Sequence, residues 1–228
     1  VHDRQTATTT RVNLGPANAQ ANDYSSSPSV SSDGRYIAFG SYASNLVTGD
    51  TNASFDIFVR DLQAGTTTRA SVDSGGTQAG ANSVDPSISP DGLYVVFTSF
   101  ASNLVSGDTN GKSDVFVRNF QFGTTTRISV SSGGTQGDNH SSAGPRSVTT
   151  NYGPLIVFSS QATNLVVGDT NAKSDVFLRD VQTGATTRVS VSLAAAQGDN
   201  NSQGGSISAD GSFVVFDSQA TNLVTGDT

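Results

Sequence analysis

The sequence predicts an all-β protein built from a repeated unit, and three observations carry this prediction. The motif TTR recurs at spacings of 58, 58 and 61 residues, with its arginine at Arg11, Arg69, Arg127 and Arg188. The motif NLV recurs at spacings of 58, 61 and 58, beginning at Asn45, Asn103, Asn164 and Asn222. The composition disfavours helix, because all nineteen acidic residues are Asp, Glu is absent, and Gly, Ser, Thr and Asn are abundant.

Four strands are expected in each unit, and the second unit shows them most clearly. A strand at 86–89 (PSIS), a PDG turn and a strand at 93–99 (LYVVFTS) form a hairpin, because Asp-Gly supplies the positive φ angles of a tight turn. Strands at 114–119 (DVFVRN) and 124–130 (TTTRISV) form a second hairpin around QFG. Val115 and Val117 alternate with Phe116 and Arg118, so one face of the strand is buried while the other meets a neighbour.

Four antiparallel strands per unit predict the blade of a β-propeller. Stacked blades bury each other's faces, which explains how a chain with only 34% apolar residues folds. The hairpins SPSVSSDGRYIAFGS, DPSISPDGLYVVFTS and GGSISADGSFVVFDS resemble the WD40-like (PD40) repeats of TolB-type β-propellers. The segments DIFVRDLQAGTTTRASV and DVFLRDVQTGATTRVSV resemble the second half of the same blade. The resemblance covers nearly the whole chain and implies a binding scaffold, usually exported in bacteria, without a defined chemistry.

The period of about 58 residues predicts one propeller domain over residues 1–228, with four blade equivalents. One blade is split between the two ends, because VHDRQTATTTRVN at the start matches LRDVQTGATTRVS from Leu178 onward. Two alternatives follow. Either the N-terminal strands complete the C-terminal blade and close a four-bladed ring, or the chain is a fragment of a longer repeat protein or of a filament. Three extra residues between Arg127 and Phe158 indicate one rebuilt loop or turn.

The loops after NLV carry oxygen-bearing side chains at a spacing that suits calcium. In DTNGKSD these side chains fall at relative positions 1, 3 and 7, and calcium takes six to eight oxygen ligands. The loop resembles the start of EF-hand-like loops and of integrin-type propeller loops, although it lacks an acidic position 5 and a final Glu. The alternative is a structural Asx turn. The candidate ligands are Asp50, Asn52, Asp56, Asp108, Asn110, Asp114, Asp169, Asn171 and Asp175.

The repeated arginines are expected to form surface ion pairs. Arg60, Arg118 and Arg179 each precede an Asp or Asn, and the arginines of the TTR motif lie across the same hairpin. Exposed pairs of this kind contribute only about 0–1 kcal/mol each.

A second polar loop follows each TTR motif and leads into the innermost strand of the next blade. Varied polar loops on a rigid ring are where propellers bind ligands, and duplication is the alternative explanation for the repeated Gln. An enzyme needs groups that break the repeat, and His140 with Asp138 and Asp199, or Asp217, are the candidates for glycoside hydrolysis. A solvated loop histidine is the alternative for His140. The candidate ligand-binding residues are Gln20, Gln78, Gln136, Asp138, His140, Gln197 and Asp199.

The sequence favours a non-enzymatic, extracellular binding or structural scaffold that calcium stabilises. A net charge of -7 argues against nucleic acid, and no apolar run is long enough to span a membrane. The absence of Cys leaves the redox compartment open. Localisation is expected to be secreted, periplasmic or cell-surface, in a bacterium. The alternatives are a glycan-binding or glycan-processing protein that uses the polar loops, and a subunit that self-associates through its incomplete terminal blade.

Overall fold

A computed structural model describes residues 1–149 and 153–227 of the chain. These residues form sixteen β-strands and one short 3-10 helix, η1 (Pro16–Asn18). The first blade contains β3 (Ser25–Val30), β4 (Tyr36–Ser41), β5 (Asp56–Asp61) and β6 (Thr66–Arg69). The second contains β7 (Ser83–Ile88), β8 (Tyr94–Ser99), β9 (Asp114–Asn119) and β10 (Thr124–Arg127). The third contains β11 (Ser141–Thr149), β12 (Leu155–Ser160), β13 (Asp175–Asp180) and β14 (Thr186–Arg188).

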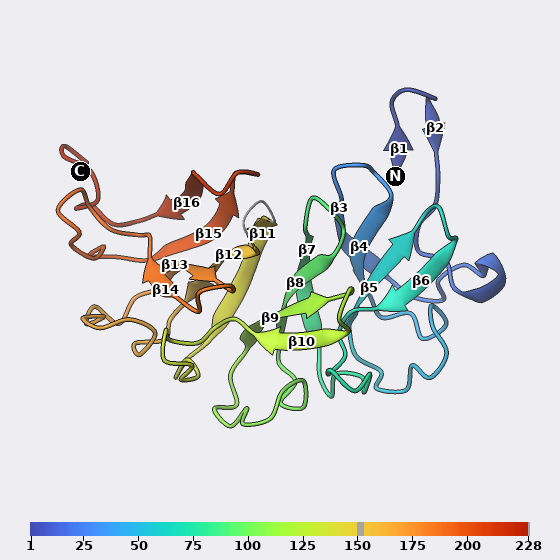
Figure 1. Cartoon of the computed structure of the whole chain (residues 1–228), viewed down its shortest axis with the longest axis horizontal. Coiled ribbons are helices and arrows are strands. Elements are labelled where there is room, and N and C mark those ends of the chain that lie inside the picture. Colours follow the sequence, from blue (N-terminus) through green and yellow to red (C-terminus); the bar gives the residue numbers. More distant parts are fainter. Residues whose placement is uncertain (150–152, 228) are drawn as a thin grey trace.

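Each of these blades is a four-stranded antiparallel sheet whose strands follow chain order. The predicted propeller built from such blades is therefore confirmed. The inner strands β3, β7 and β11 follow one another along the concave side of an arc, and the outermost strands lie on its convex side (Figure 1).

The hydrophobic core lies between the blades. Side chains from β4 and β5 pack against others from β7 and β8, and the same arrangement recurs between the second and third blades. A cross-strand phenylalanine pair recurs in every complete blade, as in Phe97–Phe116 and Phe158–Phe177, whose ring centroids are 6.0 and 5.6 Å apart. Each pair is fully buried. Stacked sheets thus exclude water from both faces, which a weakly apolar chain requires.

The inner strands approach one another closely because their residues are small. Ser29 Oγ accepts a hydrogen bond from Ile88 N at 3.1 Å, and Ser87 Oγ accepts one from Ser147 N at 2.9 Å. The register shift that interrupts each inner strand spans more residues in β11, between Ala143 and Val148. Two of the three extra residues expected near this point enlarge that bulge. The third falls in the turn containing 150–152, outside the described residues.

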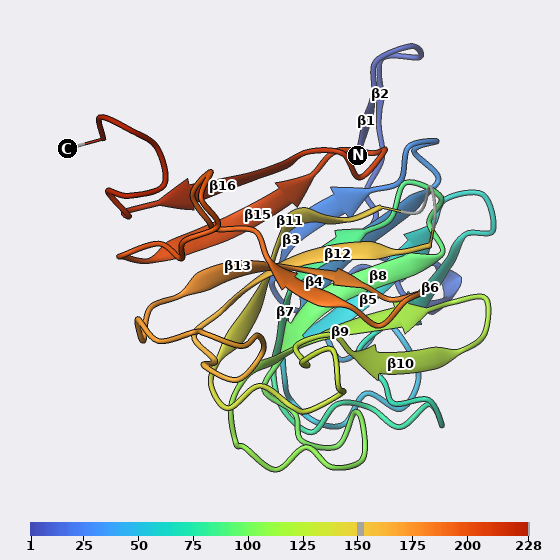
Figure 2. The same ribbon diagram turned by 60° about the vertical axis from the view of Figure 1, so that its left-hand side comes forward.

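The fourth blade is present as two separate halves. β15 (Ser202–Ile207) and β16 (Val214–Ser218) pack beside the third blade, whereas β1 (His2–Asp3) and β2 (Thr8–Thr9) form a sheet of their own. Figure 1 shows the two halves at opposite ends of the arc, and Figure 2 shows β15 beside β11 and β12. The closed ring, one of the two alternatives from the sequence, is not formed among the described residues: β1 and β2 pair with neither β15 nor β16.

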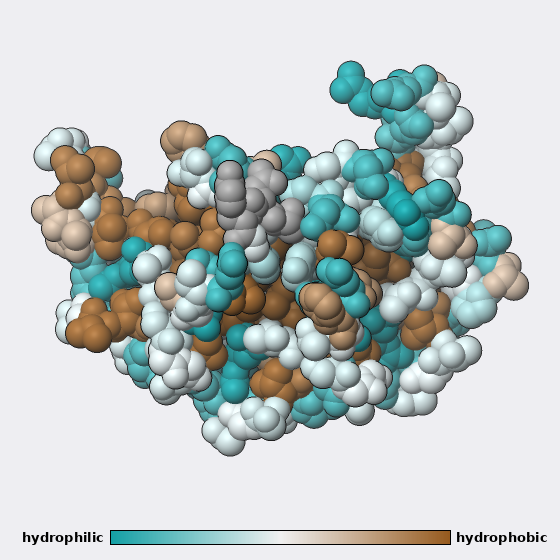
Figure 3. Space-filling view, in the orientation of Figure 1, coloured by the Kyte–Doolittle hydropathy of each residue, from teal (hydrophilic) through white to brown (hydrophobic). Residues whose placement is uncertain are grey.

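As a consequence, an apolar face of β16 remains exposed. Val215 is 72% exposed, whereas Val96, at the same place in the second blade, is completely buried by the following blade. Figure 3 shows apolar side chains gathered at this end of the molecule.

Candidate functional site

An arginine lies between two buried carboxylates in each of the three acidic loops. In the third blade, Arg188 Nη1 is 2.9 Å from Asp175 Oδ2 and 3.4 Å from Asp169 Oδ1. The second blade repeats this arrangement with Arg127 between Asp108 and Asp114, at 3.5 and 3.3 Å. In the first blade, Arg69 lies 3.6 Å from both Asp50 and Asp56. The TTR arginine therefore supplies positive charge where the sequence suggested calcium.

The asparagine of each loop closes a turn. Asn110 Oδ1 accepts a hydrogen bond from Lys112 N at 2.8 Å, which is an Asx turn, and its Nδ2 donates to Gly137 O at 2.7 Å. Asn171 makes the same two contacts, with Lys173 N and Gly198 O. Asn52 Oδ1 likewise accepts from Ser54 N, at 3.1 Å. The asparagine oxygens are thus already committed to backbone amides.

These contacts do not fit a calcium site. Calcium needs six to eight oxygens, whereas each loop offers two carboxylates that share one guanidinium as their counter-charge. Within residues 1–149 and 153–227, no three His, Cys, Asp or Glu side chains gather as metal ligands would. Burial raises the pKa of Asp108 and of Asp169 above its usual value, and the nearby arginine offsets only part of this effect.

The expectation of surface ion pairs is wrong for both groups of arginines. Arg69 is buried with its carboxylates, and Arg60 is only 5% exposed. Arg118 donates to Asp73 O at 3.0 Å and Arg179 donates to Ser131 O at 3.1 Å, so these side chains hold the loop that leaves the preceding blade. Burial lowers the pKa of both guanidinium groups. The reason is geometric, because β9 and β13 are interior strands of their sheets.

Each of the four predicted glutamines contacts the arginine of the preceding TTR motif or a carboxylate beside that arginine. Gln197 Oε1 accepts from Arg188 Nη1 at 2.8 Å, and Gln136 Nε2 donates to Asp108 Oδ1 at 2.9 Å. Gln78 contacts Arg69 in the same way, and Gln20 accepts from Arg11 Nη1 at 2.9 Å. Each glutamine therefore holds its own loop against its own blade.

Asp138 and Asp199 each bind a threonine of the following NLV segment. The Asp138 carboxylate accepts from Thr163 N and Oγ1, both at 2.8 Å, and Asp199 accepts from Thr221 in the same way. The Thr221 hydroxyl and backbone amide lower the pKa of Asp199. None of these hydrogen bonds involves His140. The structure therefore does not assemble the acid–base group that the sequence suggested.

His140 joins the second blade to the third. Its Nδ1 accepts a hydrogen bond from Ser113 N at 3.1 Å, which requires the ring nitrogen to be unprotonated, and it lies 3.1 Å from Ser113 Oγ. Asn82 and Asn201 occupy the same place in neighbouring blades, where Oδ1 accepts from Phe55 N and Ser174 N at 2.8 and 3.0 Å. The histidine thus performs the task of an asparagine.

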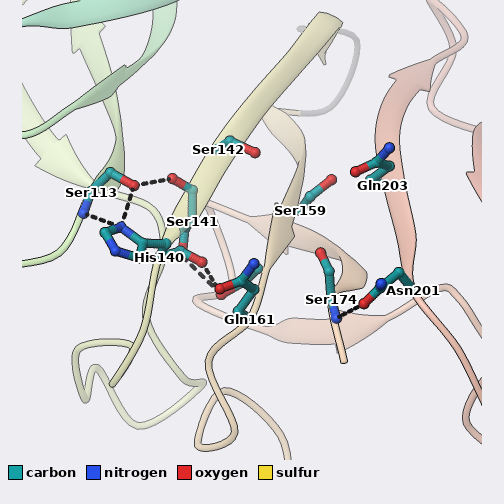
Figure 4. A pocket seen from close by; sticks show the side chains of 10 residues that line it. Ser113, His140, Ser141, Ser142, Ser159, Gln161, Ser174, Asn201 and Gln203 are labelled. Carbon is teal, nitrogen blue, oxygen red and sulfur yellow. Dashed lines mark hydrogen bonds between the residues drawn. The ribbon is translucent and has the colours of Figure 1, made fainter. Parts of the chain in front are cut away.

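A polar cavity of about 210 Å³ opens beside His140, between the second, third and fourth blades. Its wall consists of hydroxyl and amide side chains, and Figure 4 shows most of them. Apart from His140, the lining residues are Ser113, Ser141, Ser142, Ser159, Ser160, Gln161, Ser174, Asn201 and Gln203. No carboxylate, lysine or arginine is among them.

The cavity exists because serine replaces a phenylalanine. In the first blade, Phe55 is buried against Gly40, where an added Cβ would lie only 2.1 Å from the ring. Its ring also packs edge-on against Tyr42, with centroids 4.8 Å apart. In the third blade, Ser174 and Ser159 occupy the places of Phe55 and Gly40. The short side chains leave open the space that Phe55 fills.

Comparison with solved structures places this architecture among known propellers. TolB from Acinetobacter baumannii matches with a TM-score of 0.51 and 20% identity, over 90% of this chain and 42% of that chain. The fold is that of a TolB-like β-propeller. A putative TolB from Agrobacterium tumefaciens (TM-score 0.43, 18% identity) covers 87% of this chain and 52% of that one. The β-propeller domain of the Trilobed protease from Pyrococcus furiosus (0.41, 14%) covers 72% and 41%.

The likeness extends to the fold alone. No protein-family model matches the sequence, and no curated protein matches it. The chain spans about half of the length of the structures it resembles, or less. The described residues contain no helix long and apolar enough to cross a membrane.

Sequence reasoning found His140 in this TolB-like fold but missed the other residues of the cavity. A comparison of the repeats would have identified these residues. The positions of Phe55, Ser113 and Ser174 align, as do those of Tyr42, Phe100 and Gln161. A change of side-chain size or polarity at such positions marks the places where one blade differs from the next.

Proposed function

We propose that this protein is a non-catalytic binding scaffold whose ligand surface includes the cavity beside His140. One observation carries the proposal. The charged and amide residues repeated in the loops are used in hydrogen bonds that hold each loop against its own blade, whereas the cavity presents hydroxyl and amide side chains and one imidazole. Ligand sites are commonly concave and carry a few polar groups on a rigid framework.

The absence of catalysis is part of this proposal. General acid–base chemistry needs two titratable groups with different environments. His140 is the one titratable side chain that lines the cavity, and its Nδ1 is engaged with a backbone amide. Asp138 and Asp199 each hold a threonine instead.

Ligand-observed NMR with a mixed library of neutral and charged small molecules tests the scaffold. The decisive variant is S159G/S174F, which transplants the residues of the first blade and fills the cavity. Binding that this variant abolishes and that S159G alone retains supports the proposal, because both variants lose the hydrogen bond from Gly204 N to Ser159 Oγ. Binding that survives, or none at millimolar concentration, contradicts it. Turnover of chromogenic glycosides that H140N abolishes would contradict the non-catalytic part.

The proposal also covers the cellular location of the protein and its need for metal. An exported location, in the periplasm or at the cell surface, agrees with the Asp-rich, Cys-free composition. For the acidic loops we propose the metal-free alternative, in which the arginine clusters supply the stability that the sequence assigned to calcium. Fractionation of the native host with an antibody against the chain tests the location, and recovery only from the cytoplasm would exclude export.

A second candidate, self-association, has an observation of its own. The hairpin β1–β2 pairs His2 with Thr9, which is the register of Arg179 with Thr186 in the third blade. The exposed edge of β16 lacks such a hairpin among the described residues. A hairpin from a second copy would complete the sheet by β-strand addition. Light scattering across a concentration series tests this, and a constant monomer mass would exclude it.

A further inference from the structure

Each blade presents one pair of side chains at the loop end, here called the rim pair. The first member lies just before the inner strand of the blade, and the second lies just after the strand that pairs with this inner strand. A backbone hydrogen bond joins the two residues. Tyr42 N donates to Tyr24 O at 3.0 Å, and Gln161 N donates to His140 O at 2.9 Å. The four rim pairs are Tyr24–Tyr42, Asn82–Phe100, His140–Gln161 and Asn201–Gln219.

The residue types of the rim pairs differ from blade to blade, whereas the serines behind them are the same in every blade. Behind every pair, two serine hydroxyls meet at 2.8–2.9 Å, as in Ser83–Ser99 and Ser141–Ser160. The first two rim pairs are aromatic, apart from Asn82, and the last two carry amides and the His140 imidazole. The repeat is therefore broken at positions that face the solvent.

The three aromatic rim residues, here called the aromatic platform, are exposed, and a buried ring orients the two tyrosines. Tyr24, Tyr42 and Phe100 are 63, 45 and 54% exposed, which is unusual for side chains with so much apolar surface. The buried ring of Phe55 supports both tyrosines, with centroid distances of 6.4 and 4.8 Å. Such support preorganises the rings for a ligand.

The rim pairs and the cavity wall are built from uncharged side chains and one imidazole. None of the eight rim residues and none of the cavity residues is a carboxylate, lysine or arginine, although the chain has a net charge of -7. A matching ligand has no need of charge. It must offer apolar C–H faces to the aromatic rings and hydroxyl groups to Gln161, Gln203 and Ser142. Sugar rings combine these two surfaces.

A peptide fits the rim less well. Peptides that add to a sheet need free backbone donors and acceptors along an edge. At the rim those groups are already paired, as in Phe100 N with Asn82 O at 3.0 Å. The groups that remain available are side-chain amides, hydroxyls and aromatic faces.

We infer that a neutral glycan binds along this rim, with one sugar unit in the cavity beside Gln161 and Gln203 and adjoining units on Phe100 and Tyr42. This inference rests on the proposed binding function. It specifies the ligand class and adds Tyr24, Tyr42 and Phe100 to the site.

Isothermal titration calorimetry with the neutral hexasaccharides of cellulose, amylose and chitin tests the inference. The rim variant is Y42Q/F100Q, because Gln161 and Gln219 already occupy these places in the later blades. At least one hexasaccharide is expected to bind. Loss of the two stacking contacts should weaken it roughly tenfold or more. S159G/S174F should abolish it, whereas S159G alone, which loses the same hydrogen bond from Gly204 N to Ser159 Oγ, should still bind. The matching trisaccharide should bind more weakly and be less sensitive to Y42Q/F100Q.

Three results would overturn the inference. If none of the hexasaccharides binds while charged or non-sugar library compounds bind the cavity, the glycan assignment fails and the binding scaffold stands. If a proline-rich peptide binds and Y42Q/F100Q abolishes this, the platform serves a protein partner. If no hexasaccharide and no library compound binds, both proposals fail.

Discussion

Replacing Arg188 with Leu is expected to destabilise the protein by about 3–5 kcal/mol, because it removes the counter-charge of two buried carboxylates. The Arg188 side chain is only 10% exposed, and those of Asp169 and Asp175 are 2% and 0% exposed. The guanidinium also donates to Gln197 Oε1 at 2.8 Å and to Gly168 O at 3.3 Å. Leu fills part of the volume of the arginine side chain but leaves both carboxylates without a positive counter-charge.

Urea unfolding measures this effect. With a slope of about 3 kcal/mol per molar for a chain of this size, the midpoint should fall by about 1–1.7 M. The loss should shrink as the pH falls toward the raised pKa of Asp169, because protonation of that buried carboxyl removes its charge. Arg11→Leu is the matched control. Arg11 is exposed and has no ion pair among the described residues, so the free energy of unfolding of this variant should stay within about 0.5 kcal/mol of the parent value.

Calcium provides the test of the reasoning. The parent midpoint should be the same in millimolar calcium and in chelator, since arginine occupies the space between the carboxylates. An Arg188→Leu protein as stable as the parent would refute the cluster account. A parent midpoint that rises with calcium would show that the loops bind metal despite the arginine.

Three further predictions follow from single contacts. His140→Asn should change stability by less than about 0.5 kcal/mol. His140→Ala should cost about 1–2 kcal/mol, because it leaves Ser113 N without an acceptor. Equal melting temperatures for the two variants would contradict this. The hydrogen bond and charge of Arg35 lower the pKa of Asp61 to about 2, so the pair stabilises the fold above about pH 4 and less as the pH falls toward 2. Asp61→Asn should therefore be less stable than the parent near neutrality, with a difference that closes in acid; a pH-independent difference in urea midpoints would exclude the ion pair as its cause. Gly144→Ala should cost about 1–3 kcal/mol, because its Cβ would lie 2.2 Å from Gly205 O, while Gly133→Ala, whose nearest contact would be 3.8 Å, should be neutral in the same thermal melts.

The sequence predicted the blades well because their signals are local. Runs of β-branched and aromatic residues, such as Val115, Phe116 and Val117, define the strands, and the Asp-Gly turns separate them. In β9 the predicted range of 114–119 is the observed one. The cross-strand phenylalanine pairs follow from the same register.

The candidate site was predicted only in part, because its contacts join residues far apart in the chain. Asp108, Asn110 and Asp114 have the same spacing whether they hold calcium or close an Asx turn, and only the position of Arg127 distinguishes the two. His140 drew attention as a titratable residue. Its partner, Ser113, lies 27 residues earlier and in another blade.

The sequence by itself determined the repeat, the strands of each blade and the propeller class, since these depend on periodicity and turn chemistry within about 58 residues. The tertiary structure decided which side chains meet. It placed arginines between paired aspartates, left the ring open between β16 and β1, and formed a cavity where Ser174 replaces Phe55. Stacking one blade on the next brings together positions that are nearly a full repeat apart, and a cavity depends on the size of side chains from both blades at once.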